Sequence, residues 1–220
     1  GAMKPYLWFK QTLDYIFSLL LIIVLSPLLL IIAITIKLDS KGPVLFKQKR
    51  IGKDLAEFHI YKYRSMRSDT PSDMPTHLFR DPESYITASG RFLRKSSLDE
   101  LPQLFNILKG EMSFIGPRPA LWNQYDLIKA REEQKAKAGA NANGIKPGIT
   151  GWAQVNGRDE LPIDVKANLD GYYARNLSFS LDMKILFMTV FGVLTGKDVS
   201  EGGPKAQNNS KEKNIPGGDE

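Results

Sequence analysis

An acidic pair, Asp99 and Glu100, stands at the centre of the segment richest in residues that could do chemistry. Three cations come just before it, namely Arg91, Arg94 and Lys95. Arginine binds phosphate through paired hydrogen bonds, and nearby cations favour the ionised form of a carboxylate. An ionised acid can attack phosphorus or hold a divalent cation. The pattern therefore predicts a phosphate site with an acidic nucleophile, at which Mg²⁺ would screen the repulsion between nucleophile and substrate.

The same acids also suit a purely structural role. Ser97 and Glu100 have the spacing of a capping box, in which a serine caps a helix and a glutamate three residues later bonds back. Acids in a first helical turn also complement the helix dipole. Because residues 97–108 are predicted to form a helix that ends at Gly110, both interpretations stay open from the residues alone.

A further arginine, Arg118, stands between Pro117 and Pro119. Proline restricts the backbone, so this side chain is carried by a stiff segment. That arrangement suits a pre-organised phosphate contact, although a solvated arginine in a turn would have the same sequence.

Composition limits the class of protein. The 220 residues fit one domain with a real core, and the first three look like a cloning remnant. The absence of cysteine removes disulfides and thiolate metal sites, and two histidines are too few for a His-rich metal centre. A net charge of +6 and a pI of about 9.3 favour anionic partners such as nucleic acid, anionic lipid or phosphorylated substrates.

One segment, from Ile16 to Ile36, carries no charged residue. It is long enough to cross a hydrocarbon core as a helix, which takes about 20 residues. A signal peptide would need a small-residue cleavage site after the apolar run, but the chain continues through Lys37 and Asp39. A buried core helix is rarely apolar on all sides in a domain of this size. The segment is therefore predicted to insert into a membrane.

Ser26 and Pro27 lie in the middle of this segment. Proline lacks a backbone donor and clashes with the preceding turn, so it predicts a break or a kink. Lysines flank both ends of the segment, whereas a spanning helix usually has more lysine and arginine on one side. This symmetry favours a re-entrant hairpin with both ends at the cytoplasmic face. A kinked spanning helix stays the alternative.

The rest of the chain predicts a β-hairpin followed by helices and loops. The strands are expected at Pro43–Lys49 and Glu57–Tyr63, and alternation puts Phe58, Ile60 and Lys62 on one face. Glycine, proline and polar residues predict loops at 68–83, 112–119 and 138–151. A short basic turn or helix is expected at 90–95, and helices are expected at 97–108, 120–138, 164–176 and 181–194.

Several blocks of the chain, in order, resemble the monotopic phosphoglycosyl transferases, also called bacterial sugar transferases. The blocks are FKQKRIG with FHIYKYRSM, SSLDELPQLFNILKG, MSFIGPRP, PGITGWAQVNGR and DGYYARNLSFSLDMKIL. The resemblance covers Lys10 to Lys197, and the size is similar to that of the minimal members, such as the Campylobacter N-glycosylation enzyme.

The resemblance implies transfer of a sugar-1-phosphate from a UDP-sugar to a polyprenyl (undecaprenyl) phosphate, with release of UMP. It implies that Asp99 is the nucleophile, forms a covalent phosphosugar intermediate and lies at Mg²⁺, with Glu100 as a supporting acid. It assigns phosphate contacts to Arg94, Lys62 and Arg118.

Two more candidate substrate contacts, Arg158 and Asp170, fall in the later blocks. The resemblance also implies that the N-terminal helix is re-entrant and broken at Ser26-Pro27. The catalytic domain is then expected on the cytoplasmic face of the bacterial inner membrane.

The expected fold is α+β: a mostly helical cytoplasmic domain with a small β-hairpin or sheet and an N-terminal re-entrant membrane helix. Residues 4–40 are assigned to the membrane segment, 41–196 to the catalytic domain and 197–220 to a disordered tail. The expected partners are a UDP-sugar, a polyprenyl phosphate and membrane lipids, without nucleic acid. The identity of the sugar, the glycan pathway and the oligomeric state, a homodimer included, stay open.

Two other classes of function compete with this one. A glycosyltransferase that passes on the sugar alone would release UDP instead of UMP. A membrane-tethered binder of nucleic acid or anionic lipid would show salt-dependent binding and no metal requirement. The chain has no run of basic residues interleaved with aromatics, which disfavours that last class.

Overall fold

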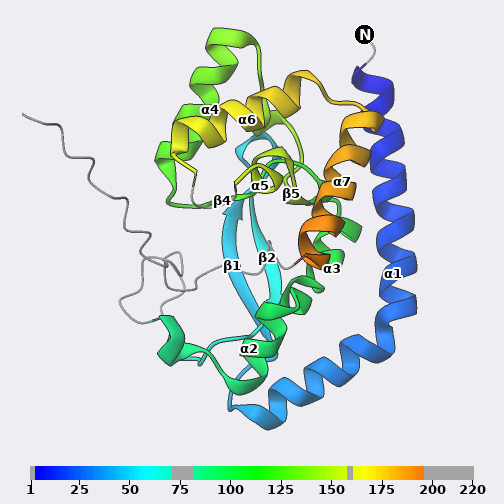
Figure 1. Ribbon diagram of the computed structural model, residues 1–220, viewed down its shortest axis with the longest axis vertical. Coiled ribbons are helices and arrows are strands. Elements are labelled where there is room, and N and C mark those ends of the chain that lie inside the picture. Colours follow the sequence, from blue (N-terminus) through cyan, green and yellow to red (C-terminus); the bar gives the residue numbers. More distant parts are fainter. Residues whose placement is uncertain (1–2, 71–81, 158–160, 196–220) are drawn as a thin grey trace, which may run out of the picture.

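A computed structural model describes residues 3–70, 82–157 and 161–195. Its elements mix helix and sheet, as expected. In Figure 1 the long helix α1 runs down one side, two small sheets occupy the middle, and α4 and α6 pack together at one end. The tail beyond Lys197 and the middle of the 68–83 loop lie outside the described residues.

Helix α1 (Met3–Asp39) is, within the described part of the chain, the helix long and apolar enough to cross a membrane. Only 11% of its most apolar window is buried. Large apolar side chains therefore cover much of its surface, and such a surface is typical of helices that contact lipid. The exposed ones include Trp8, Phe9, Phe17, Ile23, Val24, Leu30, Ile31 and Leu38.

The expected break at Ser26-Pro27 is a bend within a continuous helix. Pro27 lies inside α1, and the helix changes direction partway along its length (Figure 1). Proline cannot donate to the carbonyl four residues earlier, that of Ile23. The Ser26 hydroxyl donates to that carbonyl instead, at 2.8 Å. The serine thus replaces the hydrogen bond that the proline removes, and the helix continues.

The predicted hairpin is present, with its first strand shifted along the chain. Strands β1 (Leu45–Ile51) and β2 (Glu57–Tyr63) are antiparallel, with Leu45 opposite Tyr63. The 3₁₀ turn η1 (Lys53–Leu55) joins them. Alternation buries Phe58 and Ile60 against Leu104, Ile107 and Met112, so that face of β2 carries the core.

Contacts at the C-terminal end of β2 fix the hairpin against α1. The Tyr63 hydroxyl donates to the Leu29 carbonyl at 2.8 Å, just after the bend, and burial raises the pKa of Tyr63 to about 12. The Arg64 guanidinium donates to the carbonyls of Ser40 and Lys41, at 2.8 and 2.6 Å. The hairpin is therefore attached where α1 ends.

Two short strands lie in segments that were predicted to be loops. Strand β3 (Ser113–Ile115) pairs in parallel with β5 (Gly148–Thr150). Their flanking glycines and prolines are typical of turns, but here glycine permits close approach: a Cβ on Gly148 would lie 2.1 Å from the Gly116 nitrogen. A third short strand, β4 (Ala120–Leu121), pairs with β1. Helix α4 (Tyr125–Ala138) consequently begins later than the predicted residue 120.

The other helices mostly follow the predicted pattern. Helix α2 is Ala88–Lys95 and begins at an N-cap from Thr87, whose hydroxyl accepts from the Gly90 amide at 3.0 Å. The predicted helix over 97–108 is instead two pieces, the 3₁₀ turn η4 (Leu98–Glu100) and α3 (Gln103–Leu108), on either side of Pro102. The remaining helical elements are η3 (Pro82–Tyr85), η5 (Ala142–Gly144), α5 (Trp152–Val155), α6 (Ile163–Arg175) and α7 (Phe179–Leu194).

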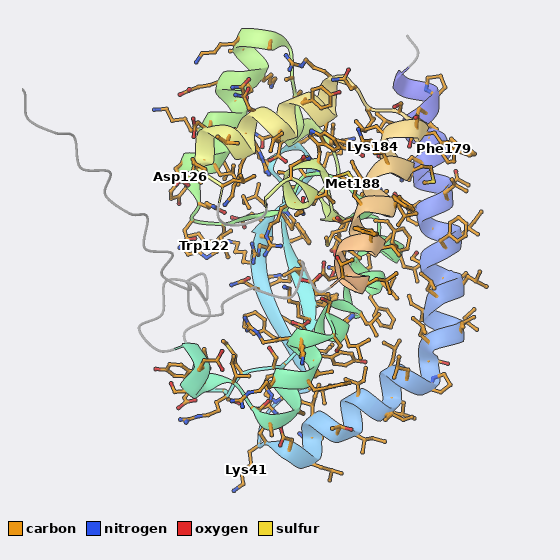
Figure 2. All side chains as sticks on the ribbon, in the orientation of Figure 1. Lys41, Trp122, Asp126, Phe179, Lys184 and Met188 are labelled. Atoms are coloured by element: carbon orange, nitrogen blue, oxygen red, sulfur yellow. The ribbon has the colours of Figure 1, made fainter. Side chains whose placement is uncertain are left out.

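Helix α7 lies beside α1 (Figures 1 and 2). The rings of Phe9 and Phe179 meet edge to face at 6.4 Å. Asp182 accepts hydrogen bonds from Lys10 at 2.5 Å and from Tyr173 at 2.7 Å, so one buried carboxylate joins α1, α6 and α7. Burial, together with this carboxylate, raises the pKa of the Tyr173 phenol.

Candidate active site

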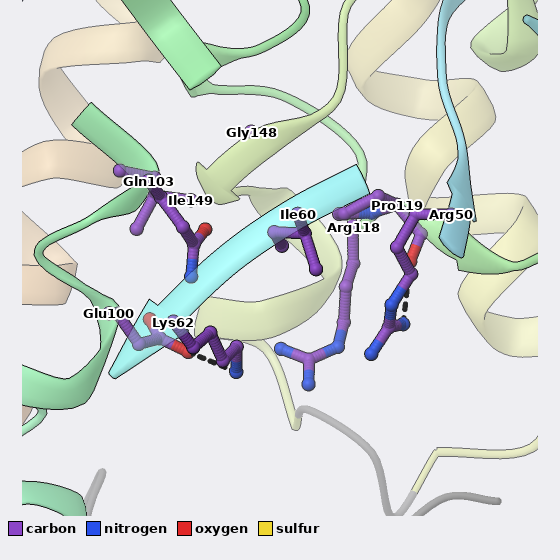
Figure 3. Close-up of a pocket in the computed structure, with 9 residues that line it drawn as sticks. All are labelled: Arg50, Ile60, Lys62, Glu100, Gln103, Arg118, Pro119, Gly148 and Ile149. Atoms are coloured by element: carbon purple, nitrogen blue, oxygen red, sulfur yellow. Dashed lines mark hydrogen bonds and ion pairs between the residues drawn. The ribbon is translucent and has the colours of Figure 1, made fainter. Parts of the chain in front are cut away.

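A polar pocket opens where the hairpin meets η4, α3, the 116–119 turn and β5 (Figure 3). Among the described residues, three cations and one acid line it, and this excess of positive charge favours an anion. Its lining residues are Arg50, Ile60, Lys62, Glu100, Gln103, Arg118, Pro119, Gly148 and Ile149.

Strand alternation brings Lys62 to the pocket. It shares a face of β2 with the buried residue Ile60 but is itself only half-buried. Its ammonium donates to a Glu100 carboxylate oxygen at 2.9 Å. The two side chains are 16% and 23% exposed, so this ion pair is partly shielded from water while still reaching the pocket.

The acidic pair lies in η4 and not in the first turn of an α-helix. Ser97, before it, has a left-handed backbone (φ 57°) and makes no side-chain capping bond. Glu100 reaches Lys62 across the pocket. The capping-box interpretation is therefore wrong, because the chain turns left-handed at the residue that would have capped the helix. Asp99 is half-buried in the same turn.

Arg118 points into the pocket from a turn that is held on both sides (Figure 3). The Pro117 carbonyl accepts a hydrogen bond from the Gly148 amide at 3.0 Å. The Pro119 carbonyl accepts one from the Arg50 guanidinium, also at 3.0 Å. These contacts join the turn to β5 and to β1.

The carbonyl of Arg118 itself accepts a hydrogen bond from Arg131 of α4, at 2.9 Å. Arg131 in turn donates to Asp170 of α6, at 2.7 and 2.9 Å. Asp170 is only 2% exposed, so this predicted substrate contact lies inside the protein, behind the turn that carries Arg118. Burial raises the pKa of Asp170, and the neighbouring Arg131 opposes that rise.

Arg94, another predicted phosphate contact, is not among the pocket-lining residues. Arg94 is half-buried in the last turn of α2, which packs against η4. Arg158 lies outside the described residues. Of the predicted phosphate contacts, the structure thus brings Lys62 and Arg118 together with Glu100 around one pocket.

Two pocket residues were missed by sequence reasoning, Arg50 and Gln103. Gln103 lies three residues after Glu100, and residues three apart in a helical segment share a face, so its spacing was a usable signal. Gln103 is 2% exposed, and its side chain faces the pocket (Figure 3). Arg50 had no such signal, because its role depends on a carbonyl 69 positions along the chain.

Two neighbouring carboxylates, those of Asp99 and Glu100, lie in η4. Among the described residues no group of three or more His, Cys, Asp or Glu side chains could hold a metal ion. Magnesium usually keeps several waters and binds through one or two carboxylates and substrate phosphates. Asp99, which was expected to lie at Mg²⁺, could supply one such carboxylate.

The chain is similar to a known protein family and to several of its members. The family model described as bacterial sugar transferase matches residues 5–196. An undecaprenyl-phosphate glucose phosphotransferase of Komagataeibacter xylinus is 42% identical over 192 residues, which are 82% of this chain and 35% of that protein. A UDP-glucose:undecaprenyl-phosphate glucose-1-phosphate transferase of Escherichia coli (strain K12) is 39% identical over 191 residues, which are 83% of this chain and 39% of that protein.

A shorter relative matches almost throughout. The uncharacterized sugar transferase EpsL of Bacillus subtilis (strain 168) is 39% identical over 192 residues, 87% of this chain and 90% of that protein. The chain thus spans about a third of the Komagataeibacter protein and most of the Bacillus one. Because the family model covers most of the chain as well, the chain belongs to the bacterial sugar transferase family.

Proposed function

We propose that this chain transfers a sugar-1-phosphate from a UDP-sugar to polyprenyl phosphate at the membrane surface. The observation that carries the proposal is the cationic pocket of Arg50, Lys62 and Arg118, which opens beside the acids of η4. The two substrates are supported by relatives that are named as undecaprenyl-phosphate glucose phosphotransferase and UDP-glucose:undecaprenyl-phosphate glucose-1-phosphate transferase.

The first step uses Asp99 as the nucleophile. A carboxylate oxygen attacks the phosphorus that carries the sugar, the bond from that phosphorus to the UMP oxygen breaks, and UMP leaves. The product is a phosphosugar bound to Asp99 through an acyl-phosphate bond. Arg118 and Lys62 bind the diphosphate oxygens and offset the negative charge that develops there.

The second step returns Asp99 to its free form. An oxygen of polyprenyl phosphate attacks the same phosphorus, the acyl-phosphate bond breaks, and polyprenyl diphosphate sugar is released. Glu100 lies beside Lys62 at the pocket, where it can take a proton from a protonated acceptor phosphate. This division gives the two neighbouring acids different roles.

Asp99 would hold the Mg²⁺, with waters and substrate phosphate oxygens completing its shell. The ion would offset the charge of the diphosphate, so that an anionic carboxylate can approach it. The protein's own part is to hold Asp99 in the half-buried η4 turn next to the cationic pocket.

The membrane setting follows from the apolar surfaces of α1 and α7. Both helices expose large apolar side chains, and they lie side by side. We place α1 in the membrane as a re-entrant helix with the pocket at the cytoplasmic face. A lipid-linked phosphate would then reach Glu100 and Lys62 from the bilayer.

The test is label exchange in the absence of a lipid acceptor. If Asp99 forms the intermediate, the protein should incorporate radiolabelled UMP into UDP-sugar without polyprenyl phosphate, because the first step is reversible. Asp99→Asn should lose this exchange and the lipid-linked product together. Asp126→Asn, an exposed acid on α4 (Figure 2), is the matched control and should retain both.

Two results would contradict the proposal. Near wild-type turnover by Asp99→Asn would mean that another group is the nucleophile. Release of UDP in place of UMP would mean that the protein passes on the sugar alone. If UMP is the product, a screen of UDP-sugars read out by UMP release would identify the donor.

A further inference from the structure

We propose that Arg131, held by Asp170, is a positioning residue that fixes Arg118 in the pocket. Neither residue lines the pocket, so the pair would act through the main chain of Arg118. This inference rests on the proposed function, in which Arg118 contacts the substrate diphosphate.

The geometry links three separate segments through one guanidinium. Arg131 Nη2 lies 2.9 Å from the Arg118 carbonyl and 2.7 Å from Asp170 Oδ2. Arg131 Nε lies 2.9 Å from the same carboxylate oxygen. The side chains of Arg131 and Asp170 are 6% and 3% exposed. Because both side chains are buried, water cannot readily replace these hydrogen bonds.

The held carbonyl belongs to the residue whose side chain enters the pocket. Prolines on both sides already restrict the backbone. The neighbouring carbonyls of Pro117 and Pro119 accept hydrogen bonds from Gly148 and Arg50. With Arg131 included, three consecutive carbonyls are each fixed to a different element, and the guanidinium of Arg118 points into the pocket (Figure 3).

A purely stabilising role explains this arrangement less well. Replacing a buried ion pair by apolar residues of similar size is often neutral or stabilising. An apolar pair could therefore join α4 to α6 without a charge. It could not donate to the Arg118 carbonyl, whereas the planar fork of an arginine can serve a carboxylate and a carbonyl at once.

The experiment replaces both members of the pair together, so that no buried charge is left alone. The variant is Arg131→Met/Asp170→Leu, studied in the full chain in detergent or nanodiscs. The control is Lys137→Met/Glu133→Leu, which removes an exposed ion pair from the same helix. Thermal unfolding should show that both double variants are folded.

If Arg131 positions Arg118, removing the pair should lower catalytic efficiency toward the UDP-sugar. The kcat/KM for UDP-sugar should fall by about ten- to a hundredfold in Arg131→Met/Asp170→Leu, because small displacements of a substrate-binding group are costly. Adding Arg118→Ala to that variant should cost much less than adding it to the wild type, since the two changes act on one contact. Arg131→Lys should fall between the wild type and the double variant.

A second readout does not depend on activity. Hydrogen–deuterium exchange in the peptide that spans Gly116 to Leu121 should rise in the double variant and stay unchanged in the control. Unchanged exchange, or a loss fully additive with Arg118→Ala, would overturn the inference while leaving UMP release by the wild type intact. An Arg118→Ala variant with normal kinetics would overturn it too. Failure of the wild type to release UMP would count against the proposed function alone. Hydrogen–deuterium exchange would still decide whether Arg131 holds the 116–121 segment in place.

Discussion

At the scale of single residues, the adjacent acids Asp99 and Glu100 have different surroundings. Glu100 lines the pocket and pairs with Lys62, while Asp99 is half-buried in the same 3₁₀ turn and is not among the pocket-lining residues. A 3₁₀ turn places consecutive side chains about 120° apart, so the two acids point in different directions. This geometry gives a physical basis for assigning them different steps.

The two half-reactions can separate these roles. Glu100→Gln keeps an oxygen that can accept from Lys62 but cannot take up a proton as a carboxylate does. We expect formation of lipid-linked product to fall by about a hundredfold, the usual worth of a general base. UMP exchange into UDP-sugar should fall much less. Equal losses in both assays would show that Glu100 serves the first step as well.

The bend in α1 is decided at the scale of a single element. Ser26 and Pro27 supply the kink and the replacement hydrogen bond within the same turn, so this feature needs no tertiary contact. Bending the helix brings its last third toward α2 (Figure 1). A re-entrant path requires such a change of direction, while a straight helix of this length would favour crossing the bilayer.

Cysteine labelling tests the path of α1, because the chain contains no native cysteine. Trp8→Cys and Lys41→Cys introduce labels near the two ends, at exposed positions. In the re-entrant arrangement both should react only with a reagent applied from the cytoplasmic side. Labelling from opposite sides would mean that α1 spans the bilayer. With Pro27→Ala added, the helix should straighten, and the two labels should move toward opposite sides.

At the scale of the whole molecule, Asp182 joins the apolar helix to the catalytic domain. Its carboxylate accepts from Lys10 and Tyr6 of α1 and from Tyr173 of α6. The residue is 2% exposed, so water cannot readily replace it. The position of the pocket relative to α1 therefore depends in part on one buried acid.

Removing this acid should be costly. In Asp182→Ala the buried Lys10 ammonium loses its partner, and breaking a buried ion pair in this way costs about 3–5 kcal/mol of stability. Asp182→Asn, which keeps an acceptor oxygen, should lose less. Thermal unfolding in detergent measures both, with the exposed acid variant Glu133→Ala as control. If Asp182→Ala unfolded at the wild-type temperature, α1 would not depend on this contact.

The sequence by itself determined the features that depend on neighbouring residues. The apolar run and Pro27 predicted an apolar helix with a break or a kink, of which the structure shows the kink, and alternation along 57–63 predicted a strand with Ile60 and Lys62 on one face. Helices α6 and α7 were predicted within a few residues. In each case the physical cause is local, because side-chain periodicity and the missing proline donor act within one or two turns.

Only the tertiary structure decided what depends on distant partners. Strands β3 and β5 are three residues each and exist because they pair with one another across the sequence. Asp170 looked like a substrate contact but is buried against Arg131, 39 positions away. Long-range contacts also give the Arg118 carbonyl and the Arg50 guanidinium their roles. The left-handed turn at Ser97 likewise depends on how the surrounding segments pack. A hydrogen bond between segments far apart leaves no periodic pattern in either one, so the sequence could suggest the chemistry of this site but not its construction.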